Sequence, residues 1–136
     1  MEDVVLKLIR MALAEDLGSG DVTGEYFVPE GCVARGFVTA REAGVLSGVE
    51  VAAQVFREVD PELAVHVLVG DGSRIGADAM VLEVSGSARS ILSGERTALN
   101  FLQRLSGVAS LTRMFVDRVA GTSARILDTR KTTPGW

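Results

Sequence analysis

Apolar residues recur at helical spacing in three parts of the chain. The period i, i+3, i+4 predicts an amphipathic helix over residues 3–14, a second over 48–58 and a long third from Ser93 to Gly121. We expect Ser93 to be the N-cap of the long helix and Gly107 to kink or interrupt it. The apolar positions that define the helices are Val5, Leu8, Ile9, Ala12 and Leu13, then Val51, Ala52, Val55 and Phe56, then Ala98, Phe101, Leu102, Leu105, Val108, Leu111, Phe115 and Val119.

Shorter runs rich in β-branched residues predict strands between and after the helices. Residues 15–24, with three glycines, are expected to break the first helix, and 70–73 to form a tight turn. The part up to about residue 92 therefore reads as an α+β sheet unit, and the long helix with its following strand begins an alternating α/β architecture. The expected strands are 32–41, 64–69, 79–84, 88–92 and 124–129.

Length and charge limit the number of domains and the kinds of ligand that the chain could bind. The 136 residues are enough for one domain, or one domain plus the start of another, and 47% apolar content allows a sizeable core. Residues 1–88 carry 6 basic and 15 acidic side chains, whereas 89–136 carry 8 and 3. This imbalance within a net charge of −4 argues against a general nucleic-acid binder and favours a local site for a small anion. Ordinary solvated arginines are the alternative.

Cysteine content and the N-terminus suggest a compartment. Cys32 is the single cysteine, so an internal disulfide and a cysteine-based metal site are excluded, which favours a reducing environment. Lys7 and Arg10 interrupt the early apolar residues, unlike in a signal peptide. No apolar run is long enough to span a bilayer. We expect a soluble, cytoplasmic protein with neither membrane nor nucleic acid as a partner.

One face of the long helix carries candidate binding residues. Arg96, Asn100 and Gln103 fall at i, i+4 and i+7, away from the apolar stripe of the same helix. With Ser93 as N-cap, Arg96 would lie in the opening turn. We expect the three polar side chains to point together into a cleft.

A second candidate lies near the end of the sequence. Arg130 and Lys131 directly follow the expected strand 124–129, at the strand end where open α/β sheets and β/α barrels place ligands. Arginine offers a planar fork for carboxylate or phosphate, and lysine a compact charge. Hydroxyl groups of Thr129 and Thr132 flank the pair, and residues 134–135 fix a turn. A plain solvated loop is the alternative.

Other polar residues are weaker candidates. His66 sits among valines of an expected strand, which is typical of a structural or solvent-facing histidine. Asp21 and Thr23 suit a ligand, but residues of these types commonly hydrogen-bond their own turn. Asp71 and Asp78 hint at a metal, yet no acidic cluster of recognisable spacing accompanies them.

Three motifs together resemble one enzyme family. They are EDLGSGDVT at 15–23, GERTALNFLQRLSG at 94–107 and DTRKTTPG at 128–135. The chain resembles the N-terminal half of quinolinate phosphoribosyltransferase, also called carboxylating nicotinate-nucleotide pyrophosphorylase. This resemblance implies an α/β fold: an N-terminal α/β sandwich domain with junction helix over 1–107, then the beginning of an open β/α barrel, truncated, over 108–136.

The resemblance also implies an activity. The family is a pentosyltransferase that moves phosphoribose from phosphoribosyl pyrophosphate to quinolinate, with Mg²⁺. Pyrophosphate and carbon dioxide leave, and nicotinate mononucleotide enters de novo NAD synthesis. By the motif match, Arg130 and Lys131 would bind substrate anions, Thr129 would support them, and Arg96 would act across the interface of a homodimer or higher even oligomer. The Mg²⁺ ligands would lie beyond residue 136, so residues 1–136 alone are expected to be inactive, with no catalytic or metal residue assigned among them.

Two other interpretations remain open. A related molybdenum-transport-associated, phosphoribosyltransferase-like protein shares the fold and the Thr-Arg-Lys loop, but generally lacks the helix start that is intact at residues 94–100. A non-catalytic oligomerisation module of the same fold is the second. Retention of Arg96, Arg130 and Lys131 argues against the latter.

Overall fold

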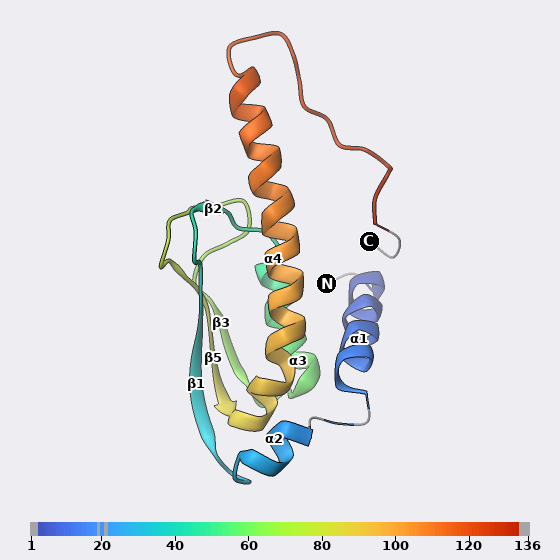
Figure 1. Cartoon of the computed structure of the whole chain (residues 1–136), viewed down its shortest axis with the longest axis vertical. Helices are drawn as coiled ribbons and strands as arrows, with labels where there is room; N and C mark the ends of the chain where they lie inside the picture. Colours follow the sequence, from blue (N-terminus) through green and yellow to red (C-terminus); the bar gives the residue numbers. More distant parts are fainter. Residues whose placement is uncertain (1–2, 19, 21, 134–136) are drawn as a thin grey trace.

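A three-stranded antiparallel sheet forms one layer of the molecule (Figure 1). Strand β5 (Met80–Ser87) is central and pairs with β1 (Val33–Thr39) on one side and β3 (Ala64–Val67) on the other. A separate two-stranded ribbon joins β2 (Gly44–Val45) to β4 (Arg74–Ile75). The computed structural model describes residues 3–18, 20 and 22–133.

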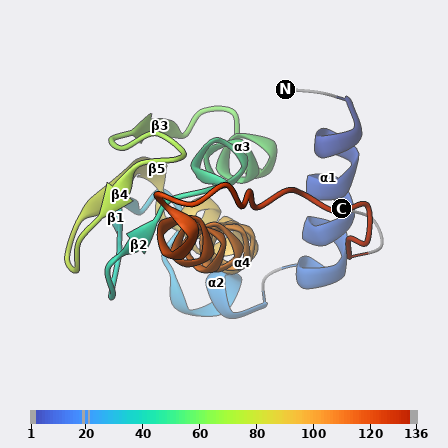
Figure 2. The same cartoon turned by 90° about the horizontal axis from the view of Figure 1, so that it is seen from above.

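Helices cover one face of this sheet in two further layers. Helices α3 (Val49–Val59) and α4 (Ala88–Val119) pack on the sheet, and α1 (Asp3–Leu17) packs on both of them from the far side (Figures 1 and 2). The short helix α2 (Val22–Phe27) contacts α4 near its beginning. Within the described part of the chain, no helix is long and apolar enough to cross a membrane.

The core lies between the sheet and the helices. Alternation along β5 turns Leu82 and Val84 inward, and the helical period turns one stripe of each helix towards them. On α4 the predicted stripe is confirmed at Ala98, Phe101 and Leu102, while Leu105 is only partly buried. The other buried apolar residues are Ile9, Leu13, Leu46, Val49, Ala52, Ala53, Val55, Phe56, Leu63, Val81 and Ala88.

Most predicted elements are confirmed. The helices expected over 3–14 and 48–58 correspond to α1 and α3, and the strands expected at 32–41, 64–69 and 79–84 correspond to β1, β3 and β5. The break expected over 15–24 is partly wrong. Its first residues, as far as Leu17, complete α1, and its last ones belong to α2.

The strand predicted at 88–92 is wrong, because α4 already begins at Ala88. The N-cap is Ser87, whose side chain accepts a hydrogen bond from the Ser90 amide, so Ser93 as N-cap is also wrong. A short apolar run is compatible with either a strand or a buried helix. The hydrogen-bonded N-cap at Ser87 favours the helix here. At 3.6 residues per turn, Arg96 therefore lies in the third turn and not the first.

The interruption predicted at Gly107 is wrong as well, since α4 runs unbroken from Ala88 to Val119. Side chains on either side of this glycine hold the helix against the β2 segment. Ser106 accepts a hydrogen bond from the Ser47 amide at 3.0 Å, and Ser110 accepts one from the Val45 amide at 2.8 Å. These tertiary contacts offset the weak helix propensity of one glycine.

The strand predicted at 124–129 is wrong too: these residues have no regular secondary structure. A strand is stabilised by hydrogen bonds to a neighbouring strand. No other strand of the described chain pairs with this segment. The pattern of apolar residues alone is not sufficient to form the strand.

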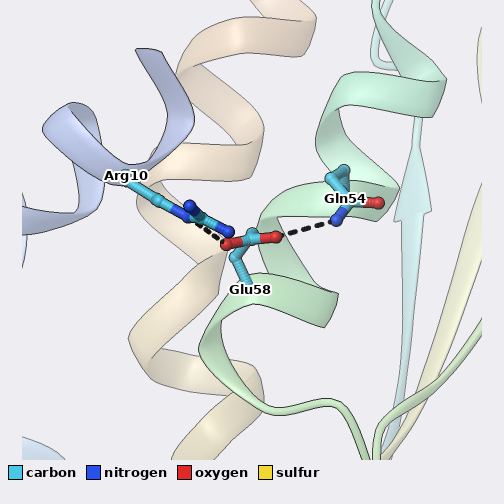
Figure 3. Close-up of polar contacts among 3 residues, drawn as sticks. All are labelled: Arg10, Gln54 and Glu58. Carbon is cyan, nitrogen blue, oxygen red and sulfur yellow. Dashed lines mark hydrogen bonds and ion pairs between the residues drawn. The ribbon is translucent and has the colours of Figure 1, made fainter. Parts of the chain in front are cut away.

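An ion pair ties α1 to α3 (Figure 3). Arg10 Nε donates to Glu58 Oε2 at 2.8 Å, and Gln54 Nε2 donates to Glu58 Oε1 at 3.0 Å. The hydrogen bond from Arg10, followed by that from Gln54, holds the pKa of Glu58 below its ordinary value. Both carboxylate oxygens are thus engaged, and α1 is held at its middle.

This pair generates a pH-dependent prediction. The folded pKa of Glu58 lies below its ordinary value of 4.5, so its ionised form favours folding. The stabilisation is complete above that ordinary value and is lost as the pH falls through the lower folded pKa. Glu58→Gln should therefore be less stable than wild type at neutral pH, and urea unfolding should show the gap closing on acidification. The exposed Glu62→Gln is the control; a gap that is constant with pH would contradict the assignment.

Two glycines of contrasting surroundings give a second prediction. Gly48 has a φ of +90°, and an added Cβ would lie 2.5 Å from Leu105 Cδ1, whereas a Cβ at Gly107 would meet nothing within 4 Å. Gly48→Ala should lower the free energy of unfolding by roughly 1–3 kcal/mol through strain and overpacking. Gly107→Ala should raise it by about 1 kcal/mol through helix propensity. Urea denaturation of both variants measures this, and shifts of the same sign would refute it.

Candidate functional site

An open cleft lies between α4 and α2. Its volume is about 660 Å³, and it is lined on the α4 side by Arg96, Asn100 and Gln103 together. The predicted convergence of these three side chains on one cleft is confirmed. The remaining lining residues are Gly24, Phe27, Val28, Leu92, Glu95 and Leu99.

A second cleft of about 620 Å³ lies on the other side of Arg96, between α4 and α1. Arg96 and Asn100 line both clefts, so the arginine stands on the ridge between them. The polar residues found only in the second cleft are Glu15, Asp16, Thr97 and Arg104. An anion entering from either side would meet the same guanidinium.

Arg96 is held by α1. Its Nη1 donates to Asp16 Oδ1 at 3.1 Å, and the arginine side chain remains 74% exposed. Thr97, which is buried, donates from Oγ1 to Asp16 Oδ2 at 3.5 Å. One carboxylate thus binds two consecutive residues of α4 and leaves most of the guanidinium open to solvent.

Local packing explains why Arg96 faces outward. Ala98 and Phe101 occupy the buried stripe of α4, and the 3.6-residue period places Arg96 on another face. Gly94 lies against α3, where an added Cβ would be 3.0 Å from Phe56 Cδ1. The glycine therefore allows the turn that carries Arg96 to approach α3 closely.

Arg89 fixes the opposite wall of the first cleft. Its Nε donates to the Val28 carbonyl at 2.9 Å, and its Nη2 donates to the Glu25 carbonyl at 3.1 Å. These acceptors lie at and just beyond the C-terminal end of α2, where carbonyl groups lack partners within the helix. Arg89 is therefore a structural arginine that positions α2.

The second predicted group of cations lies on an exposed segment. Arg130 and Lys131 follow α4 in residues 120–133, which turn back towards α1 (Figures 1 and 2). The Lys131 amide donates to Thr129 Oγ1 at 3.2 Å, so Thr129 shapes the loop. The turn expected at residues 134–135 lies outside the described residues.

The two groups of cations do not share a cleft in this structure, because the linings of the two clefts beside Arg96 include neither Arg130 nor Lys131. Arg104, two turns beyond Arg96, donates from Nη2 to Thr133 Oγ1 at 2.9 Å. The segment that carries Arg130 and Lys131 is thus anchored on the same helix as Arg96.

The polar residues that were weaker candidates have structural or solvent-exposed positions where the structure describes them. His66 is exposed on β3 opposite Glu83, as expected for a solvent-facing histidine. Asp71 Oδ1 accepts a hydrogen bond from the Val49 amide at 2.9 Å and caps α3, whose N-cap Gly48 has no side chain. Asp21 and the side chain of Thr23 lie outside what the structure describes. Among the described residues, no three His, Cys, Asp or Glu side chains form a group that could hold a metal ion.

Asp16 and Arg104 are residues that the sequence interpretation missed. Asp16 lies within the stretch expected to form a turn, and it is 80 residues from Arg96. No periodicity links positions so far apart. Arg104 had a usable signal, because it follows Asn100 by four residues and so falls beside it on the helix.

A helix-backed antiparallel sheet that presents an arginine between two open clefts defines an α/β domain suited to binding anions. A family model described as quinolinate phosphoribosyl transferase, N-terminal domain, matches residues 21–106. The chain belongs to this family.

Curated relatives agree with this assignment. The carboxylating nicotinate-nucleotide pyrophosphorylase of Mycobacterium leprae is 45% identical over 136 residues, which cover 98% of this chain and 48% of that protein. The probable enzyme of the same name from Synechocystis is 42% identical over 93% of this chain and 43% of its own length. The chain spans less than half the length of these two relatives.

Solved structures share the fold. The nicotinate-nucleotide pyrophosphorylase from Francisella tularensis superimposes with a TM-score of 0.92 at 38% identity, covering 98% of this chain and 48% of that one. NadC from Streptococcus pyogenes gives 0.91 at 39% identity, covering 96% and 46%. The predicted α/β fold class is confirmed.

The exposure of Arg96 predicts that its removal leaves the fold intact. An ion pair with one largely exposed partner contributes at most about 1 kcal/mol, so Arg96→Ala should change the free energy of unfolding by no more than that. Phe101→Ala, on the buried stripe of the same helix, should cost about 3–5 kcal/mol. Thermal and urea unfolding compare the two variants. Equal losses would mean that Arg96 is part of the core packing.

Proposed function

We propose that this chain contributes the N-terminal part of a quinolinate phosphoribosyltransferase. That enzyme transfers phosphoribose from phosphoribosyl pyrophosphate to quinolinate and yields nicotinate mononucleotide for NAD synthesis. The observation that carries the proposal is the exposed guanidinium of Arg96 between two clefts of a domain that matches this family. The names of the relatives at 42–45% identity support the same reaction.

The chemistry of the substrates fits cations of the kinds found here. Quinolinate has two carboxylates, and the donor has several phosphates, so charge must be bound at both ends of the reaction. Arg96 and Arg130 offer bidentate forks for carboxylate or phosphate, and Lys131 offers a point charge. Fixed cations near a departing pyrophosphate also stabilise the charge that develops there. Thr129 would shape the Arg130–Lys131 loop.

Magnesium is implied by the family but does not fit the residues described here. Mg²⁺ needs oxygen ligands in near-octahedral order, commonly carboxylates. Among the described residues, no group of three acidic, histidine or cysteine side chains could supply them. In this proposal the metal ligands come from outside residues 1–136.

Assembly is part of the proposal. The second half of α4 exposes an apolar stripe, in which Val108 is 62% exposed, Leu111 55% and Phe115 51%. Such a stripe on a helix is typical of a surface that another domain or subunit covers. We propose a homodimer or higher even oligomer, located in the cytoplasm, in which Arg96 reaches the substrate site of the neighbouring subunit.

A chimaeric enzyme tests the function directly. Residues 1–136 would replace the matching segment of the Mycobacterium leprae relative, with which they align over 98% of this chain. We expect this chimaera to form nicotinate mononucleotide from quinolinate and phosphoribosyl pyrophosphate, and residues 1–136 alone, as the negative control, to form none. Arg96→Ala and Arg130→Ala should each lower kcat/KM by at least about 30-fold, the equivalent of roughly 2 kcal/mol for an unpaired buried carboxylate.

Mixed dimers test the action across the interface. A dimer of one Arg96→Ala chain and one Arg130→Ala chain would contain one site free of both substitutions if Arg96 acts in the neighbouring site. Partial activity should therefore return on mixing. Verified mixed dimers that are as inactive as the single variants would exclude action across the interface, and a folded but inactive wild-type chimaera would count against the function itself.

A further inference from the structure

The carboxylate of Asp16 is fixed more firmly than the arginine it contacts. Its side chain is 18% exposed, against 74% for Arg96. Oδ1 accepts from Arg96 Nη1 at 3.1 Å, and Oδ2 lies 3.5 Å from the hydroxyl of the buried Thr97. Both oxygens therefore face α4, Oδ1 in a hydrogen bond and Oδ2 in a longer contact, and the low exposure of the carboxylate limits its freedom to turn.

The contact with Arg96 is made through one end of the guanidinium. Nη1 makes this bond, while Nε and Nη2 make none to any other residue in the described part of the chain. A carboxylate or phosphate binds arginine in bidentate fashion along one edge of its planar fork. The end-on contact thus leaves the Nε–Nη2 edge open for an anionic ligand while it limits rotation of the side chain.

We propose that Asp16 is a positioning residue for Arg96, which keeps the guanidinium oriented with that edge towards the incoming substrate carboxylate. The proposal rests on the proposed function for the identity of the anion, but the positioning itself is a property of this chain. A long, exposed arginine loses rotamer freedom when it binds a ligand, and a contact formed beforehand removes part of that cost.

Anchoring of α1 is the competing explanation for Asp16. Helix α1 has other attachments, however, because Ile9 and Leu13 are buried in the core and Arg10 binds Glu58. Asp16 differs from Arg10 in contacting the candidate binding arginine. Arg10→Ala is therefore a matched control that weakens the attachment of α1 without touching Arg96.

Simple charge repulsion makes the opposite prediction. A carboxylate beside an anion site disfavours a second anion, so a purely electrostatic role would mean that Asp16→Ala and Asp16→Asn both improve binding. Positioning predicts that Asp16→Ala weakens binding, while Asp16→Asn, which keeps an acceptor oxygen in place, stays close to wild type. The pair of variants separates the two roles.

The first experiment measures the mobility of the Arg96 side chain and does not require enzymatic activity. Nitrogen-15 NMR relaxation of the arginine side-chain Nε–Hε groups, with Arg96 assigned by its loss in Arg96→Lys, reports how ordered this side chain is. In residues 1–136 we expect an ordered Arg96 that becomes mobile in Asp16→Ala, remains ordered in Asp16→Asn and is unchanged in Arg10→Ala. Equal order in wild type and Asp16→Ala would overturn the proposal. If Asp16→Ala fails to fold, Thr97→Val decides: Arg96 should become more mobile when Thr97 releases the carboxylate, and unchanged order would overturn the proposal.

The second experiment measures the consequence in the chimaeric enzyme. Asp16→Ala should raise KM for quinolinate by about tenfold, the value of ordering one long side chain, with little change in kcat or in KM for phosphoribosyl pyrophosphate. Asp16→Asn should restore most of that loss, and Arg10→Ala should have no such effect. The same KM in Asp16→Ala and Arg10→Ala would overturn the proposal. An inactive wild-type chimaera would argue against the proposed function alone, because the NMR result tests the positioning without it.

Discussion

Packing of α4 against both α3 and the sheet is the constraint on which the rest of the structure depends. Ala98, Phe101 and Leu102 are each at most 7% exposed, and burial of apolar surface is the main favourable term in folding. Once this stripe is fixed, the helical period sets the direction of every other side chain in the first half of α4. The outward position of Arg96 follows from where its apolar neighbours are buried. The site is therefore a by-product of core geometry, refined by contacts from α1 and α2.

The sequence predicted those features that rest on local periodicity. Helices α1 and α3, strands β1, β3 and β5, and the shared cleft of Arg96, Asn100 and Gln103 all follow from spacing within a few turns or a few alternations. The wrong predictions have a common cause: contacts between residues distant in the sequence determine these features. The start of α4 depends on the cap at Ser87, and its continuity through Gly107 is supported by serine contacts to the β2 segment. Asp16 contacts Arg96 only because α1 packs against α4, and no local sequence pattern predicts a contact between residues so far apart.

The uneven distribution of charge along the sequence takes on a more specific meaning in the fold. Several arginines of the basic second part have structural partners: Arg89 binds carbonyl groups at the end of α2, and Arg113 pairs with Asp117 one helical turn away. Arg113 fits the alternative of an ordinary solvated arginine, whereas Arg89 has a structural role. Arg96 differs, because it stands between two open clefts with most of its guanidinium in solvent. Position relative to a cleft, and not local excess of charge, distinguishes a candidate binding cation.

The unbroken length of α4 has a geometric consequence. A helix of 32 residues at 1.5 Å per residue extends about 48 Å, and its near half is embedded in the core while its far half projects beyond it (Figure 1). Each inserted or deleted residue within this rod would rotate the far half by about 100° relative to the near half. The number of residues between Arg96 and the apolar stripe at Val108, Leu111 and Phe115 thus fixes the angle between them around the helix axis. An insertion of about seven residues, which is two full turns, would preserve this angle. The helix therefore fixes the orientation of any surface that covers the apolar stripe relative to Arg96.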